Sequence, residues 1–204
     1  MSSSLNEAAP GDRKRWRLFV AAPLSEANRA ALKRPISELA SLNPAVNPSR
    51  IDAIHLTLNF LNSVETNRIE GISRSLKEAV ALSAGFEVDV VGVGAFPSLA
   101  RPRVLWAGIS GAGRARLIEL QAATGAALRA AGMEVESRSY TPHLTLARLR
   151  AAVGAAERSE IARWSERWTE AGFGALAIDA LHLMRSELSE RPTRHTSLQS
   201  FALQ

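Results

Sequence analysis

The tetrapeptide HLTL occurs twice, at residues 55–58 and again at residues 143–146, in a chain of 204 residues. The chain has four histidines and two of them open these motifs, which a chance match explains poorly. In a β-strand, residues two apart share a face of the sheet. Each motif therefore predicts a strand that sets an imidazole beside a hydroxyl on one face and points two leucines into the core.

The segments around the two motifs repeat in one order, strand, helix, strand, helix, strand. Apolar or alternating runs predict the strands, and apolar residues at helical spacing predict the helices. Equivalent positions lie 87 or 88 residues apart, which indicates two structurally equivalent lobes related by a pseudo-two-fold axis. The expected strands cover residues 17–22, 51–61, 86–96, 104–109, 141–149 and 173–184, and the expected helices cover residues 25–39, 69–80, 117–128 and 161–168.

Local signals refine this pattern. Ser25 and Ser63 are predicted helix N-caps, because a serine hydroxyl accepts a hydrogen bond from a free N–H of the first helical turn. Pro35 is expected to kink the first helix or to begin a second one. The last stretch, residues 196–203, is expected to add an edge strand or to pack across one lobe.

The composition is that of an ordinary globular protein, with 46% hydrophobic and 22% charged residues. The lack of cysteine excludes disulfides, a thiol nucleophile and cysteine-ligated metal sites. A net charge of +5, carried mostly by arginine, favours an anionic partner such as phosphate, because the planar guanidinium can donate two parallel hydrogen bonds. Biased codon usage explains so much arginine better than selection for phosphate binding does, so the composition is only a weak indication of a phosphate-bearing partner.

The apolar runs and the start of the chain bear on location and domain organisation. No apolar run reaches the ~18 residues that a membrane-spanning helix needs, and the first residues lack the apolar stretch of a secretory signal. We therefore expect a cytoplasmic protein that makes no membrane contact. Residues 1–14 are predicted to form a disordered tail, and residues 15–204 a single bilobal domain that works as a monomer.

Two facing imidazoles suit acid–base chemistry at phosphorus. A histidine has an ordinary pKa of about 6.5, so near neutrality one ring can accept a proton while another donates one. In-line displacement needs this division between a base on the attacking oxygen and an acid on the leaving oxygen. The hydroxyls of Thr57 and Thr145 can donate hydrogen bonds to the non-bridging phosphate oxygens. With His55 and His143 they are the predicted catalytic residues, and no metal or cofactor is required.

Other uses of paired histidines fit the sequence less well. A metal site usually takes a third histidine or a carboxylate, and Asp52 precedes His55 by three residues without a counterpart before His143. The sequence lacks the G-x-S-x-G elbow of a serine hydrolase and the glycine-rich loops of the Walker and dinucleotide-binding types. Metal-independent phosphoryl transfer is therefore the predicted chemistry.

The wider sequence resembles the two-histidine (2H) phosphoesterase superfamily and, within it, the bacterial RNA 2',3'-cyclic phosphodiesterases, formerly called 2'-5' RNA ligases. The resemblance rests on the two H-x-T-x motifs and on the stretches RLFVAAPL, RPRVLWAG, PHLTLAR and MRSEL, and it runs from about Arg15 to the C-terminus. It implies a bilobal α+β fold with two antiparallel sheets flanking a central cleft, helices outside, and the motif strands at the centre.

The resemblance also implies an activity in RNA processing, the metal-independent hydrolysis of an RNA or nucleotide 2',3'-cyclic phosphate to a 2'-phosphate. His55 would be the proton donor to the 3' oxygen, and His143 would be the proton acceptor that activates water. This assignment comes from the resemblance alone, because two near-identical motifs give no basis for choosing. The family usually has a Trp ahead of the first motif, where this chain has NPAVNPSRIDAI, and a Gly where it has Asn62. The first departure bears on substrate contacts from the loop before His55.

Three further residues are candidate substrate contacts. Arg148 lies five positions after the second motif histidine and would face the opposite side of a regular strand, so it reaches a substrate only from a strand end or a β-bulge. Tyr140 and Phe19 could stack on a base, although aromatic residues in strands belong more often to the core. His182 and His195 are expected to be structural.

Two other functions stay open. A non-catalytic module that captures RNA ends would bind without turnover, and a reversible 2'-5' RNA ligase would join ends with the same residues. In each case the expected partner is RNA with a 2',3'-cyclic phosphate end, or a cyclic nucleotide.

Overall fold

The computed structural model describes residues 14–42, 45–136, 138–150, 153–187 and 193–204. Residues 1–13 of the predicted disordered tail lie outside the described residues. Lys14, the last residue of that predicted tail, already contacts the folded part, since its carbonyl oxygen accepts a hydrogen bond from the N–H of Thr66 at 3.0 Å.

Strands and helices alternate along the described residues. The strands are β1 (Arg15–Pro23), β2 (Val46–Pro48), β3 (His55–Glu65), β4 (Phe86–Phe96), β5 (Val104–Ser110), β6 (His143–Leu149), β7 (Gly172–Ile178), β8 (Ala180–Glu187) and β9 (Arg194–Ala202). The helices are α1 (Glu26–Leu42), α2 (Ile69–Val80), α3 (Arg114–Ala130) and α4 (Ala155–Trp168), with short 3₁₀ turns η1 (Ile51–Ala53) and η2 (Thr66–Arg68). The predicted α+β class is confirmed.

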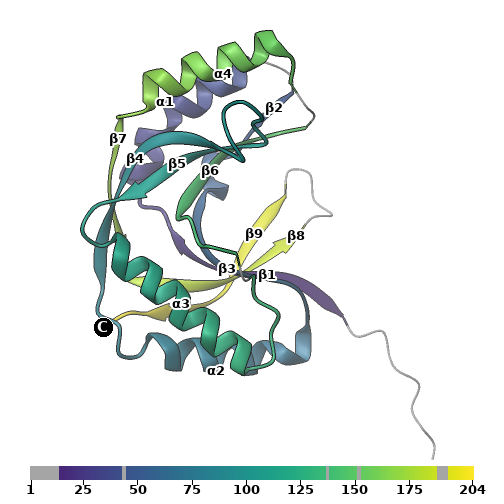
Figure 1. The fold of residues 1–204 in the computed structure, drawn as a ribbon. Coiled ribbons are helices and arrows are strands. Elements are labelled where there is room, and N and C mark those ends of the chain that lie inside the picture. The colour runs from purple at the N-terminus through teal and green to yellow at the C-terminus, as the bar shows by residue number, and fades with distance from the viewer. Residues whose placement is uncertain (1–13, 43–44, 137, 151–152, 188–192) are drawn as a thin grey trace, which may run out of the picture.

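The described strands form one curled antiparallel sheet in the order β7-β4-β5-β6-β3-β1-β8-β9, with β2 paired to β6. Its two halves meet where Leu56 of β3 pairs with Leu144 of β6. The two sheets implied by the resemblance are therefore two halves of one sheet, because the motif strands pair with each other. Figure 1 shows α1 and α4 outside one half and α2 and α3 outside the other.

The strand order follows the predicted pseudo-two-fold. Reversing the path β4-β5-β6-β3-β1-β8 exchanges β1 with β5, β3 with β6 and β4 with β8, the elements that repeat along the sequence. The third strand of each repeat crosses to the other half of the sheet, since β4 pairs with β5 and β8 pairs with β1. The two lobes are therefore not the two halves of the sequence, which corrects the simplest form of the prediction.

The strand predicted over residues 173–184 is two strands. β7 ends just before Asp179 and β8 begins just after it. The equivalent residue of the first repeat, 87 positions earlier, is Gly92, and the pairing of β4 with β5 shifts in register at that residue. Gly92 has φ +68°, a left-handed conformation that glycine adopts without a Cβ clash. The bend at Asp179 lets one stretch of chain pair first with β4 and then with β1.

The local predictions have mixed outcomes. Ser25 caps α1, because its hydroxyl oxygen accepts the N–H of Asn28 at 3.1 Å. Ser63 does not cap a helix, since β3 continues past it to the next 3₁₀ turn. α1 runs through Pro35 as one helix, so no second helix begins there, and the indole of Trp164 donates to the Pro35 carbonyl at 3.1 Å. The predicted edge strand near the C-terminus is confirmed as β9.

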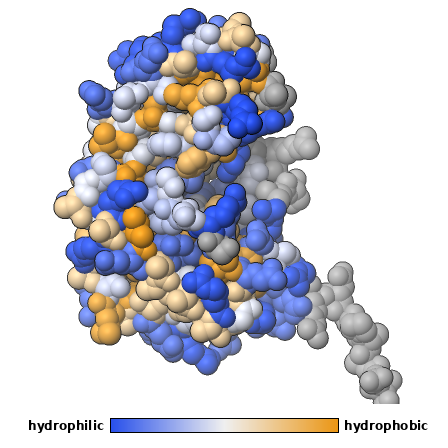
Figure 2. Space-filling view, in the orientation of Figure 1, coloured by the Kyte–Doolittle hydropathy of each residue, from blue (hydrophilic) through white to orange (hydrophobic). Residues whose placement is uncertain are grey.

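The core lies between the sheet and the helices. Leu56 and Leu144 are fully buried there, as the motif pattern predicts. Asn28 is also fully buried, and its side-chain nitrogen donates to the carbonyls of Phe173 at 2.9 Å and Ala175 at 3.1 Å, which ties α1 to β7. Figure 2 shows apolar side chains in small scattered groups among polar ones on the visible face. No helix among the described residues is long and apolar enough to cross a membrane.

Candidate active site

The two motif strands bring the four predicted catalytic residues together at the centre of the sheet. Continuing the register of the central leucine pair sets His55 opposite Thr145 and Thr57 opposite His143. On both strands the histidine and threonine are half-buried while the leucines are fully buried, so all four polar side chains lie on the face away from the core.

The same backbone contact orients both motif histidines. Nδ1 of His55 lies 2.8 Å from the carbonyl oxygen of Ala53, and Nδ1 of His143 lies 2.8 Å from that of Thr141. A carbonyl oxygen can only accept, so Nδ1 carries the proton and donates it in both rings. Nε2 is left as the atom that can exchange a proton with a ligand.

Burial lowers the pKa of both motif histidines. The pKa of His55 falls from its ordinary 6.5 to about 4, first because burial disfavours the charged ring and then because His195 adds positive potential, with smaller contributions from Arg148 and the other motif histidine. The pKa of His143 is lowered by burial and by Arg148, against the hydrogen bond to its backbone partner. Both rings are therefore neutral near pH 7, and an anion between them would raise both pKa values.

Arg148 reaches this face through a β-bulge. β6 slips by one residue against β5, which leaves Leu146 as an extra residue between the pairs formed by Thr145 and Ala147. Leu146 and Ala147 are both buried as a result, and Arg148 returns, exposed, to the face of the motif. Its charge lowers the pKa of both motif histidines. The sequence predicts that Arg148 can reach a substrate only from a strand end or a β-bulge, and a bulge is present here.

β3 carries the same bulge, and it exposes a residue that sequence reasoning missed. The pairing with β1 skips Leu58 between the pairs formed by Thr57 and Asn59. Leu58 and Asn59 are both buried, and Phe60 is 43% exposed on the motif face. Phe60 lies 88 residues before Arg148, so the repeat itself could have identified it. One half presents an aromatic ring where the other presents a guanidinium.

The two aromatic candidates occupy supporting positions. Phe19 is 3% exposed and its ring stacks on the imidazole of His55, with 4.6 Å between centroids, so the face expected to stack on a base is taken up by that histidine. The hydroxyl of Tyr140 donates to the backbone carbonyl of Thr57 at 2.9 Å. Burial raises the pKa of Tyr140, which keeps the phenol protonated in this contact. Both side chains brace the first motif strand.

His195 lies beside His55, although it was expected to be structural. The two rings meet edge-on with 5.1 Å between centroids, and Nδ1 of His195 is buried with no hydrogen-bond partner among the described residues. Burial also lowers the pKa of His195. The pairing of β9 with β8, and of β8 with β1, brings it here. No local motif marks residue 195, so only the path of the last strand could have revealed it.

A pocket of about 80 Å³ opens beside His55, and His195 and His182 also line it. Hydroxyls of β9 contact both ring nitrogens of His182, in keeping with the structural role expected of it. On the other side of the face, the ring of Phe96 meets that of His143 edge-on at 4.9 Å. Among the described residues, no group of three or more histidine or carboxylate side chains is placed to hold a metal ion.

An α+β fold built on one curled sheet, with two H-x-T strands paired at the centre of that sheet, defines a protein of the two-histidine class. A family model described as the 2'-5' RNA ligase superfamily matches residues 23–190. The chain belongs to this superfamily, and the resemblance found in its sequence is confirmed.

Several curated relatives are named RNA 2',3'-cyclic phosphodiesterase. That of Methanothermobacter thermautotrophicus is 26% identical over 187 residues, which cover 92% of this chain and 98% of the relative. That of Thermus thermophilus is 30% identical over 190 residues, covering 92% and 90%. The Geobacillus stearothermophilus relative matches 66% of this chain at 29% identity, and the matched part is 42% of that longer protein.

Solved structures share the fold. A crystal structure of a Thermus thermophilus protein has a TM-score of 0.75 and 26% identity, covering 92% of this chain and 97% of that one. The structure of E. coli LigT complexed with 3'-AMP has a TM-score of 0.69 and 26% identity, covering 93% and 99%. The predicted fold class is confirmed by these likenesses.

Proposed function

We propose that this protein hydrolyses a 2',3'-cyclic phosphate, on an RNA end or a nucleotide, to a 2'-phosphomonoester. The observation that carries the proposal is the pairing of the motif strands, which puts two imidazoles on one face, each with Nδ1 held by a carbonyl. The names of the relatives support the same class of reaction, and one related structure is complexed with 3'-AMP.

The reaction divides between the two rings. Nε2 of His143 takes a proton from water, whose oxygen forms a bond to phosphorus as the bond from phosphorus to the 3' oxygen breaks. Protonated His55 gives its Nε2 proton to the departing 3' oxygen. The products are a 2'-phosphomonoester and a free 3'-hydroxyl. The family resemblance supports this choice of acid and base.

The lowered pKa of His55 makes substrate binding part of acid catalysis. With a pKa of about 4 the ring is neutral at pH 7 and has no Nε2 proton to give. The cyclic phosphate is an anion, and an anion beside the ring favours its charged form. We therefore infer that the acid takes up its proton as the substrate binds.

Three side chains are available to stabilise the charge on the phosphate. The hydroxyls of Thr57 and Thr145 make no hydrogen bond to any described residue, so both can donate to non-bridging oxygens. Arg148 is exposed, near both imidazoles and in no ion pair with a described carboxylate, and its guanidinium suits two oxygens of one phosphate. Phe60 is the exposed aromatic of the same face, and we assign base stacking to it in place of Phe19.

The test is hydrolysis of 2',3'-cyclic nucleotides with and without EDTA, with products identified by phosphorus NMR. We expect 2'-phosphate at a rate that the chelator leaves unchanged. Formation of 3'-phosphate would contradict the assignment of the leaving oxygen, and loss of activity in EDTA would contradict metal independence. Size-exclusion chromatography with light scattering would test the predicted monomer, and cell fractionation the predicted cytoplasmic location.

The same samples separate the two alternatives. A ligated product from a strand with a 2',3'-cyclic end and a second strand with a 5'-hydroxyl would favour a reversible 2'-5' ligase. Binding of the cyclic end without turnover, across several bases and lengths, would favour an RNA-end-binding module.

A further inference from the structure

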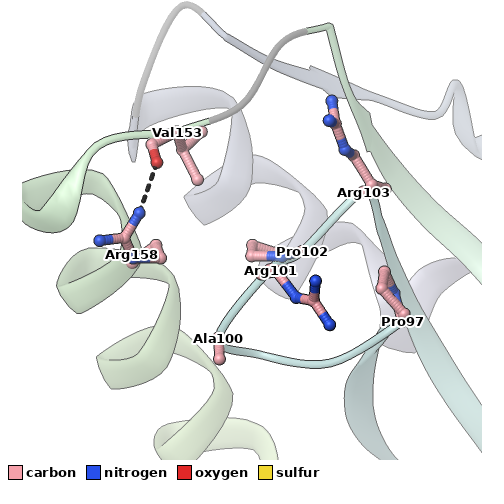
Figure 3. A pocket seen from close by; sticks show the side chains of 7 residues that line it. All are labelled: Pro97, Ala100, Arg101, Pro102, Arg103, Val153 and Arg158. Atoms are coloured by element: carbon pink, nitrogen blue, oxygen red, sulfur yellow. Dashed lines mark hydrogen bonds between the residues drawn. The ribbon is translucent and has the colours of Figure 1, made fainter.

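A second and larger pocket, of about 320 Å³, lies between the loop that joins β4 to β5 and helix α4. Arg101 and Arg103 line it from the loop, Arg158 lines it from α4, and none of its lining residues is acidic. Figure 3 shows Arg158 on the α4 side and the other two arginines extending from the loop opposite. Three arginines from two separate elements therefore line the pocket.

The three guanidinium groups have no counter-charge among the described residues. None of them forms an ion pair with a described carboxylate. Arg158 donates one hydrogen bond, to the carbonyl of Val153 at 2.7 Å, and the side chains of Arg101 and Arg103 donate none to a described residue. Like charges held together raise the electrostatic potential of a concave surface, so an anion with several acceptor oxygens is the ligand that fits.

The pocket adjoins the second motif strand. The ring of Phe96 contacts the ring of His143. The carbonyl oxygen of Phe96 accepts a hydrogen bond from the backbone N–H of Arg103, with 2.8 Å between the two atoms. The carbonyl of Arg103 in turn accepts the N–H of Leu149, the last residue of β6, at 2.9 Å. The pocket loop is therefore hydrogen-bonded to the end of the strand that carries His143 and Arg148. The four arginines of this region, Arg148, Arg103, Arg101 and Arg158, are called the basic track.

The structure of a cyclic end determines which phosphates of the substrate could contact the basic track. The cyclic phosphate occupies the 2' and 3' oxygens of the last nucleotide, so a longer strand continues only through the 5' oxygen. Every other phosphodiester of the substrate lies on that 5' side, each with one negative charge. A strand bound by its cyclic end leaves the reaction face in one direction with its charges in a row.

We propose that the arginine pocket is a second phosphate subsite, which binds a backbone phosphodiester upstream of the cyclic end. This inference rests on the proposed function for the cyclic end and adds that the substrate is an RNA strand in preference to a mononucleotide. The pocket holds the strand while the two imidazoles act on its end.

The test compares 2',3'-cyclic AMP with a short oligoadenylate that ends in a 2',3'-cyclic phosphate. For the pair Arg101→Ala/Arg158→Ala we expect the KM of the oligonucleotide to rise roughly tenfold, because two charged hydrogen-bond donors are lost. The slope of log affinity against log salt should fall by about 0.7 for each phosphate contact removed. Activity on 2',3'-cyclic AMP should stay within about twofold, since a mononucleotide has no upstream phosphate.

The matched control is Arg114→Ala/Arg129→Ala, which removes from α3 two exposed charges that form no ion pair with a described carboxylate. An equal loss of oligonucleotide affinity in this control would mean that net charge alone attracts the strand, and the proposal would be wrong. Arg101→Glu covers the case in which the Arg158 variant folds poorly, because the side chain of Arg101 makes no hydrogen bond to a described residue. An unchanged KM for the oligonucleotide in Arg101→Glu overturns the subsite.

Two further measurements separate this proposal from its alternatives. Fluorescence anisotropy of a labelled oligonucleotide measures binding without turnover. If the protein hydrolyses no substrate, the proposed function is wrong, and the anisotropy still tests whether the pocket binds the strand. Inorganic phosphate is the other source of the same chemistry. Thermal stabilisation by phosphate that the double variant loses, with no change in oligonucleotide affinity, would assign the pocket to the free ion and overturn the strand assignment.

Discussion

The imidazole of His195, in the last strand, lies edge-on to the imidazole of His55, with 5.1 Å between ring centroids. Charge on either ring disfavours charge on the other, so the two titrate as a coupled pair. The acid of the proposed reaction is thus kept neutral partly by a residue that belongs to neither motif.

His195→Asn is expected to raise the pKa of His55 above its value of about 4, because His195 makes the largest electrostatic contribution to the lowering of that pKa. Titration of the His55 ring by NMR measures this shift. His182→Asn is the control, since His182 lines the same pocket and does not contribute to the pKa of His55. An equal shift in both variants would show that loss of packing, not charge, is responsible.

Replacing either motif histidine should abolish most of the activity. For His55→Asn or His143→Asn we expect kcat to fall by roughly 10²–10⁴, the usual contribution of a general acid or base. The double variant should lose little more than either single one, because the two rings act in one step. Circular dichroism should show an unchanged fold, and wild-type turnover by His143→Asn would refute the mechanism.

The pH dependence follows from the direction of the two pKa shifts. The free enzyme needs one charged and one neutral ring, and both pKa values lie below 6.5, that of His55 at about 4. The kcat/KM value should therefore peak below pH 6.5 and fall as pH rises through the higher pKa. The profile of kcat should lie at higher pH, because the bound anion raises both values. A kcat/KM profile that stays flat up to pH 8 would contradict the assignment.

Phe60→Ala tests base stacking on the exposed ring of β3. Stacking on an aromatic side chain contributes about 1–3 kcal/mol per base, so KM should rise roughly 5- to 150-fold with little change in kcat. Phe60→Trp should retain the affinity. Leu82→Ala removes another exposed apolar side chain, 96% exposed, and should have no effect. Equal KM values for Phe60→Ala and the wild type would remove Phe60 from the site.

Asn28→Ala should destabilise the fold by about 2–3 kcal/mol, since two buried carbonyls of β7 lose their donor. Urea unfolding measures the change. Asn67→Ala, at an exposed position in η2, should leave the midpoint unchanged. A loss below about 1 kcal/mol for Asn28→Ala would mean that other groups satisfy these carbonyls.

The elements of the fold could be predicted from the sequence because their signals are local. The strand over residues 86–96 and the helix over residues 69–80 have the expected bounds, since alternation and helical spacing are read within one segment. The assignment of strands to lobes could not be predicted, because β4 and β8 pair with strands of the other repeat. The break at Asp179 has a similar cause, as both flanking segments read as strand.

The candidate site divides in the same way. His55, His143 and their threonines stand in a duplicated motif, and i to i+2 geometry alone puts each pair on one face. Arg148 and Phe60 depend on bulges that shift the alternation by one residue, and a regular strand gives the wrong face for both. His195 depends on the pairing of the last strand, about 140 residues away in sequence from its neighbour.

The crossing of the third strands has an evolutionary consequence. A chain of half this length, holding a single copy of the repeat, would contain one imidazole, one hydroxyl and a third strand with nowhere to pair. Two such chains could rebuild the path β4-β5-β6-β3-β1-β8 only by exchanging that strand, as domain-swapped dimers do. Their reaction face would exist only between the two copies. Duplication and fusion of such a gene would join into one chain two copies that already depended on each other.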